Sequence, residues 1–160
     1  MREHTDPFYL NITKMITNHG RMILAIGPDG KSPPFFYTIG NHLKGNPELL
    51  CLGPWEPSMG QWLLNALSEQ MLERGSGFGN GELINAGGEQ SLQVWNATVI
   101  AKLQYTLQTT EYYGHKDYDV QQVVIPDPKG RYPGDKRVNK KYRVPVLRAT
   151  AEIMQSLRLH

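Results

Sequence analysis

The stretch MILAIGPDGKSPPFFYTIG, residues 22–40, decides how the N-terminal half of the chain folds. Its first five residues are all apolar, and such a short run predicts a strand near the centre of a sheet. The turn residues at 28–30 (PDG) end that run, and the prolines at 33 and 34 prevent a helix. Residues 35–40 then predict a second strand. The stretch therefore predicts a hairpin with a long turn.

The flanking segments predict helices and further strands around this hairpin. Asp6 and Pro7 supply an N-cap and a first helical residue for a helix that ends at Gly20. The other expected elements are strands at residues 48–52, 92–101 and 118–125, and helices at residues 57–75, 102–114 and 144–159. Together they predict an α+β fold with a central, mostly antiparallel sheet of about five or six strands and two to four packed helices.

Length and composition indicate one domain over residues 1–160, and a C-terminal helical tail is expected at about 147–160. The hydrophobic fraction of 39% and the charged fraction of 20% are those of a globular chain, so disorder is not expected. Cys51 is the single cysteine, which excludes an internal disulfide. It lies in an apolar run and is expected to be a buried, inert thiol.

The charge balance and hydropathy exclude two classes of partner. Net charge is +2, from 17 basic and 15 acidic residues, so binding to extended nucleic acid is not expected. No apolar stretch approaches about 18 residues and no signal-peptide core is present, so we expect a cytoplasmic protein without membrane contact. One local basic cluster stands out, either as a solvated loop or as an anion site: Lys129, Arg131, Lys136, Arg137, Lys140, Lys141, Arg143 and Arg148.

No motif fixes a reaction or a cofactor. The glycine-rich stretch at residues 75–81 follows a predicted helix and lacks the Gly-Lys-Ser/Thr ending, so it predicts a flexible connector or a lid rather than a phosphate loop. The five histidines show no metal-ligand spacing, and no Gly-x-Ser-x-Gly elbow is present. We therefore assign no catalytic residue, no metal and no cofactor.

Residues 125–133 (IPDPKGRYP) form the most distinctive loop in the sequence. Three prolines and a glycine fix its backbone, so that Asp127, Arg131 and Tyr132 are presented in a defined turn. Arginine contacts phosphate or carboxylate in bidentate fashion, and tyrosine stacks on planar rings. The loop predicts either a site for a nucleotide-like ligand or a well-ordered turn without a ligand.

A second wall of the same site is predicted around the strand at residues 35–40. Tyr37 and Thr38 lie in that strand, and His42 follows it in a polar loop, where a side chain can project from a sheet end. We expect these three residues to face Asp127, Arg131 and Tyr132. Gln122, in the strand before the distinctive loop, completes the predicted ligand-binding set.

Four segments together resemble a bacterial and phage family named "domain of unknown function 4262". They are residues 34–40 (PFFYTIG), 46–50 (NPELL), 63–67 (LLNAL) and 122–133 (QVVIPDPKGRYP). The resemblance covers about residues 20–147 and implies an α+β fold with a shared site. Ile125 stands where the family often has an aromatic residue, and Gly134-Asp135 replaces an aromatic-acidic pair. The second departure puts the rim of the pocket in doubt, and no catalytic residue is carried over.

The leading functional hypothesis is a non-enzymatic binder of a nucleotide-like or phosphorylated small molecule, assembled as a homo-oligomer. A phage-type protein that sequesters a bacterial immune nucleotide signal in the bacterial or phage-infected host cytosol fits this description.

Two alternatives stay open. The first is a hydrolase acting on a similar ligand, with His42 as acid or base, Glu48 or Asp127 as the carboxylate and Arg131 holding the charge. Glu48 and Asp127 each flank a predicted strand, so both are also candidates for structural caps. The second alternative is a protein-interaction module that uses exposed aromatic residues such as Trp55 and Trp95.

Overall fold

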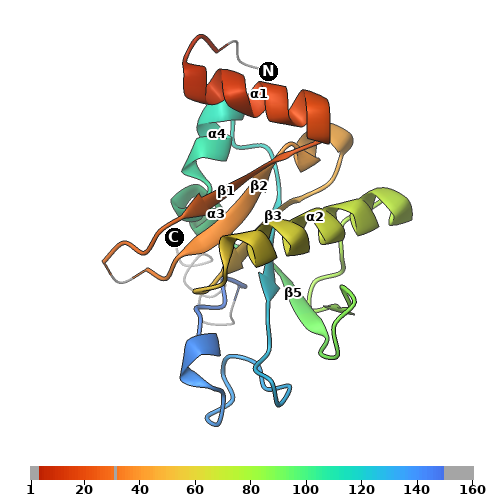
Figure 1. The fold of residues 1–160 in the computed structure, drawn as a ribbon, viewed down its shortest axis with the longest axis vertical. Coiled ribbons are helices and arrows are strands. Elements are labelled where there is room, and N and C mark those ends of the chain that lie inside the picture. The colour runs from red at the N-terminus through yellow and green to blue at the C-terminus, as the bar shows by residue number, and fades with distance from the viewer. Residues whose placement is uncertain (1–3, 31, 150–160) are drawn as a thin grey trace, which may run out of the picture.

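A computed structural model describes residues 4–30 and 32–149 (Figure 1). One sheet of six strands has the order β1-β2-β3-β6-β5-β4. The strands are β1 Met22–Ile26, β2 Phe35–Ile39, β3 Glu48–Leu52, β4 Leu83–Ile84, β5 Leu92–Asn96 and β6 Val120–Val124. Neighbouring strands are antiparallel except β3 and β6, which are parallel. The predicted α+β class with a mostly antiparallel sheet is confirmed.

Four α-helices and two short 3₁₀ helices complete the described chain. They are α1 Pro7–His19, α2 Pro57–Arg74, α3 Val99–Tyr105, α4 Leu107–Tyr113, η1 Asn41–Lys44 and η2 Lys140–Tyr142. The Asp6 side chain accepts a hydrogen bond from the Phe8 amide, and Gly20 closes α1 at a φ of 91°, a backbone conformation that favours glycine. The predicted boundaries of α1 and α2 are confirmed.

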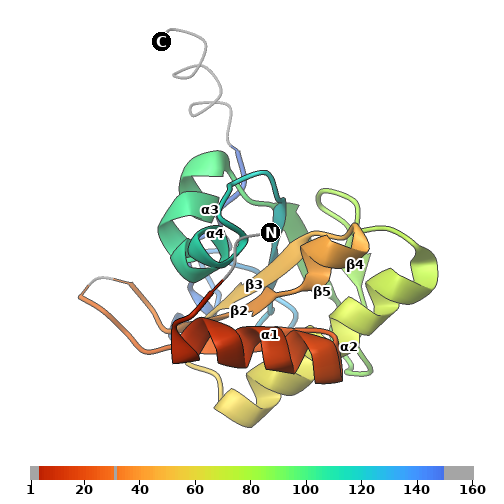
Figure 2. The same cartoon turned by 90° about the horizontal axis from the view of Figure 1, so that it is seen from above.

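The helices cover both faces of the sheet (Figure 2). Helix α2 packs Leu63, Leu64 and Leu67 on one face, against strand residues that include Cys51 and Val123. A second set of buried side chains, on the opposite face, comes from α1, α3, α4 and the alternate strand residues: Ile12, Tyr37, Ile39, Leu50, Leu52, Ala101, Tyr105, Tyr112, Tyr113, Tyr118 and Val120. Successive strand residues point to opposite faces, so each central strand contributes to both layers.

Strand β1 is an edge strand, so its predicted place near the sheet centre was wrong. Its run is apolar on both faces because Ile23 packs with the α2 layer while Met22, Leu24 and Ile26 pack with the α1 layer. Burial on two faces is therefore compatible with an open hydrogen-bonding edge.

Two other boundaries differ from the prediction. The strand expected at residues 92–101 ends at Asn96, because the Thr98 side chain accepts a hydrogen bond from the Ala101 amide and caps α3. The helix expected at residues 102–114 is a pair, α3 and α4, that meets at Thr106, whose hydroxyl donates to the Lys102 carbonyl at 2.6 Å.

The described part of the predicted C-terminal helix is extended. Residues 144–148, called the C-terminal strap below, contain Pro145, which lacks the amide that a helix interior needs. The Gln122 side chain binds the strap main chain at Pro145 and Leu147, and Arg148 forms a β-bridge with Ala97. These partners replace helical hydrogen bonds. Residues 150–160 of the predicted tail lie outside the described residues.

Replacing Gly60 by alanine should destabilise the fold. A Cβ at this α2 position would lie 2.8 Å from the ring of Phe36, which is only 3% exposed. Alanine favours a helix by about 1 kcal/mol over glycine, but overpacking costs about 1–3 kcal/mol. We expect a net loss of about 1 kcal/mol in the free energy of unfolding, measured with urea. Ser58→Ala, on the exposed first turn of α2, is the control; equal or higher stability in Gly60→Ala would contradict the close packing.

Candidate functional site

The structure does not bring the two predicted walls together. Strand β2 is antiparallel to β3 while β6 is parallel to β3, so β2 and β6 end at opposite ends of the sheet. Thr38 and His42 lie at the end of β2, and the loop with Asp127 follows the end of β6. Tyr37 is fully buried, and its hydroxyl donates to Gln108 rather than facing a cavity. The predicted facing of these residues is wrong because sheet direction separates them.

Glu48 is held at the first sheet end by five donors. One carboxylate oxygen, Oε1, accepts from the Thr38 hydroxyl at 2.7 Å and the Asn41 amide at 3.1 Å. The other, Oε2, accepts from the Gly40 amide at 3.2 Å, the His42 amide at 3.0 Å and the Tyr113 hydroxyl at 2.5 Å. Burial raises the pKa of Glu48, and the hydrogen bonds from Tyr113 and Thr38 oppose that rise. Glu48 is 0% exposed, and its contacts with the amides of Gly40, Asn41 and His42 satisfy the start of η1, as one reading of the sequence expected.

His42 lies beside this carboxylate, on the outer side of Tyr113. Its ring centroid is 5.2 Å from that of Tyr113 and 5.6 Å from that of His115. Burial and the neighbouring His115 lower the pKa of His42, so the neutral imidazole is favoured. Within residues 4–30 and 32–149, no group of three or more His, Cys, Asp or Glu side chains could hold a metal ion.

Asp127 organises the distinctive loop from within. Its Oδ1 accepts from the Lys129 amide at 3.0 Å and the Arg131 amide at 2.9 Å, and its Oδ2 accepts from the Asn139 amide at 3.0 Å. Burial alone would raise the pKa of Asp127, but these amides hold it below the ordinary value. With 2% exposure, the carboxylate stabilises the turn through these three amides.

Arg131 and Tyr132 line two different cavities. Arg131 donates to the Arg137 carbonyl at 2.6 Å and borders a cavity of about 240 Å³ together with Asp127 and Lys129. Tyr132 donates to the Ser91 carbonyl at 2.6 Å and lines a larger hollow. The predicted pairing of an arginine and a tyrosine in one site is therefore not formed by these two residues.

The larger hollow, called the Trp95 pocket, does combine a cation with aromatic rings. Its volume is about 540 Å³, and its walls are Gln93, Trp95, Tyr132, Pro133, Gly134, Val144, Val146 and Arg148. The Arg148 guanidinium lies 4.2 Å from the centroid of the Trp95 ring. Among the described residues, Arg148 has no carboxylate partner, and the buried Trp95 Nε1 has no acceptor. The pocket thus offers an unpaired positive charge next to an indole.

Strand register explains how the sequence builds this pocket. Trp95 of β5 pairs with Gln122 of β6, so both side chains point to the same face. Gln122 is 0% exposed and binds the strap at Pro145 and Leu147, which leaves the alternate strap residues to line the pocket. Of the predicted ligand residues, Tyr132 lines the pocket and Gln122 supports its wall.

Sequence reasoning assigned no ligand contact to Trp95 and named Arg148 only as one member of the basic cluster, either a solvated loop or an anion site. The available signal was the segment Val144-Pro145-Val146, in which two β-branched residues flank a proline that disfavours a helix. Of the two aromatic residues proposed for protein contacts, Trp55 is 9% exposed and packs against Tyr142, and Trp95 is partly buried beside Arg148.

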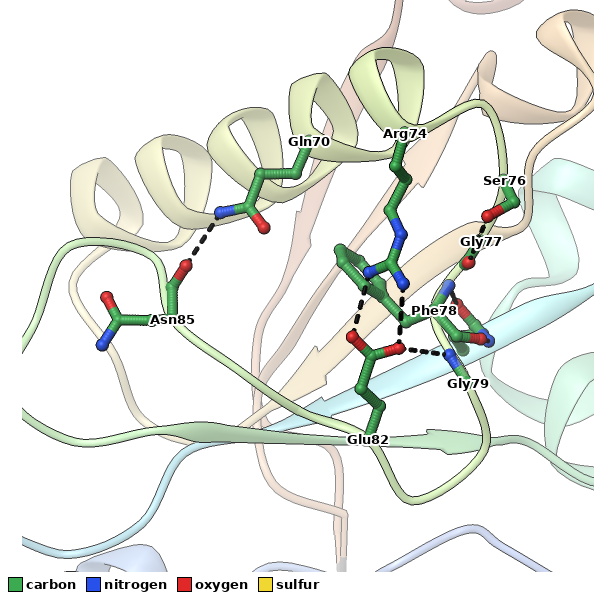
Figure 3. Close-up of polar contacts among 9 residues, drawn as sticks. Gln70, Arg74, Ser76, Gly77, Phe78, Gly79, Glu82 and Asn85 are labelled. Atoms are coloured by element: carbon green, nitrogen blue, oxygen red, sulfur yellow. Dashed lines mark hydrogen bonds and ion pairs between the residues drawn. The ribbon is translucent and has the colours of Figure 1, made fainter.

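The glycine-rich connector is pinned at several points (Figure 3). Arg74 donates to both Glu82 oxygens, at 3.0 and 3.2 Å, and the Gly79 amide donates to Glu82 at 2.7 Å. The Phe78 amide donates to the buried Gln121 side chain at 3.0 Å. Residues 75–81 connect α2 to β4, which begins at Leu83. Hydrogen bonds to side chains hold this segment in place of the backbone hydrogen bonds of a helix or sheet, which glycine disfavours.

None of the helices described at residues 4–30 and 32–149 has the length and apolar character that a membrane span needs.

Comparison with known proteins supports the family resemblance. No curated protein and no solved structure matches the chain. The family described as "Domain of unknown function (DUF4262)" matches residues 15–139, which include the motifs at residues 34–50 and 122–133. The chain belongs to this family.

Proposed function

We propose that the protein binds a small aromatic anion, such as a nucleotide, in the Trp95 pocket and does not convert it. The observation that carries this proposal is the unpaired Arg148 guanidinium over the Trp95 ring. An arginine presents a planar fork of donors that matches a phosphate, and the pocket also contains the Tyr132 ring, on which a planar ring can stack. The same two features are what a nucleotide-like ligand requires.

The size and order of the pocket support this assignment. Its volume of about 540 Å³ lies within the range of about 300–1,000 Å³ that is usual for small-molecule sites. The Tyr132 ring is fixed by the hydrogen bond from its hydroxyl to Ser91, so little side-chain freedom is lost when a ligand enters. A phosphate contact with Arg148 would also pair a charge that has no counterion among the described residues.

The positions of the acidic and basic side chains favour binding over hydrolysis. Both oxygens of Glu48 and of Asp127 already accept hydrogen bonds from the protein. His42 lies at the other end of the sheet from Arg131, so the hydrolase candidates do not gather at one site. Sequestration of an intact ligand is therefore the proposed mode of action, and a phage-type role against a nucleotide signal is proposed with it.

The test is calorimetric titration of the full chain with AMP, GMP and cyclic mono- and dinucleotides. We expect at least one of these to bind, adenosine to bind more weakly than AMP, and the ligand to be recovered intact by chromatography. A converted product would favour the hydrolase alternative. Absence of binding to every nucleotide tested would overturn the proposal. Light scattering on the same samples measures whether the protein is the proposed homo-oligomer.

A further inference from the structure

We infer that Gln122 is a positioning residue that couples docking of the C-terminal strap to ligand affinity in the Trp95 pocket. This inference rests on the proposed function, because it concerns the regulation of the same site. In this inference Gln122 does not contact the ligand. Gln122 acts by holding the strap, whose residues form one wall of the pocket.

Gln122 binds the strap as a neighbouring strand would. Its Nε2 donates to the Pro145 carbonyl at 2.7 Å, and its Oε1 accepts from the Leu147 amide at 2.7 Å. The residue is fully buried, so an amide without these partners would lose the compensation for its desolvation. The strap in turn supplies the hydrogen-bond partners of Gln122, which lies between Val120 and Val124 on the same face of β6. The buried Gln122 side chain and the docked strap therefore stabilise each other.

The strap has few other anchors. The Thr98 amide donates to the Leu147 carbonyl at 3.0 Å, and Arg148 forms a bridge with Ala97. Val144 and Leu147 pack at the border of the α1-side core without being fully buried. A short segment with so few contacts opens at a lower free energy than the whole domain.

Opening of the strap would remove the pocket. Val144, Val146 and Arg148 all leave the site with it, and Arg148 is the one positively charged side chain that lines the pocket among residues 4–30 and 32–149. A ligand that binds only the docked form has an apparent affinity proportional to the docked fraction. By linkage, the ligand must stabilise docking by the same factor.

The test replaces Gln122 by leucine, which keeps a similar size and removes both hydrogen bonds. Hydrogen exchange of the Thr98 amide reports docking, because this amide donates to the strap and not to Gln122. We expect Thr98 exchange in the variant to approach the rate of an unprotected amide, because the strap is then mostly undocked, and AMP affinity to fall by the factor by which the docked fraction falls. Gln70→Leu, at a partly buried position of α2 whose side chain donates to the Asn85 carbonyl and not to the strap, should change neither. In the wild type, saturating AMP should slow Thr98 exchange, which tests the coupling even if the Gln122 variant does not fold.

The outcomes separate the inference from the proposed function. Thr98 exchange at the rate of an unprotected amide together with unchanged AMP affinity would overturn the coupling. Lower affinity with unchanged Thr98 exchange would also overturn it, because Gln122 would then act without the strap. If the wild type protects Thr98 but binds none of the nucleotides, the proposed function fails and the coupling to a ligand fails with it.

Discussion

Replacing Glu48 by glutamine should lower the free energy of unfolding by about 3–5 kcal/mol. The carboxylate offers only acceptors and receives five donors from Thr38, Gly40, Asn41, His42 and Tyr113. A glutamine converts one of the two oxygens into an NH₂ group, which faces the donors that the oxygen had accepted. Each buried donor left without an acceptor costs about 1–3 kcal/mol, and at least two are affected.

Urea unfolding followed by far-UV circular dichroism measures this loss. The control is Asp119→Asn, which removes an exposed carboxylate one strand away and should change stability by less than about 0.5 kcal/mol. A loss below about 1 kcal/mol for Glu48→Gln would show that these donors find other partners, and would contradict the capping role of Glu48.

Replacing Arg148 by glutamine should weaken AMP binding by about 10- to 100-fold. A hydrogen bond to a charged group contributes about 1.5–3 kcal/mol, and this variant removes the charge that a phosphate would meet. Binding of adenosine should change much less, because it lacks the phosphate. Since Arg148 is exposed, the variant is expected to fold like the wild type.

Arg143→Gln is the matched control for this experiment. It removes another exposed arginine five residues earlier that does not line the Trp95 pocket. Calorimetric titration of both variants at one salt concentration separates a specific contact from the general effect of net charge. Equal losses in the two variants would show that AMP responds to the basic segment as a whole, and would remove Arg148 from the site.

Local signals in the sequence predicted most of the elements correctly. Asp6, Pro7 and Gly20 fixed both ends of α1 because caps and glycine stops act within one turn of the chain. The strands at residues 35–39 and 120–124 followed from short apolar runs with flanking turns. Such signals depend on neighbouring residues alone, which is why they could be found without a structure.

The candidate site could not be predicted because it depends on sheet order and direction. Nothing in the segments themselves shows that β6 runs parallel to β3, and this one relation places Asp127 far from His42. The Trp95 pocket depends on a contact between Gln122 and a strap more than 20 residues later. Nothing in the neighbouring residues marks Gln122 as buried, so its contact with the strap could not be recognised from the sequence.

The parallel pairing of β3 with β6 also affects how the chain must fold. The hairpin β1–β2 and strand β3 are close in sequence, whereas β3 meets a strand about 70 residues farther on. Contacts of such high sequence separation form late, because the loop entropy must be lost before they contribute. During synthesis, the apolar edge of β3 therefore stays open until β6 has been made. In this interval the nascent chain is most exposed to aggregation through that edge.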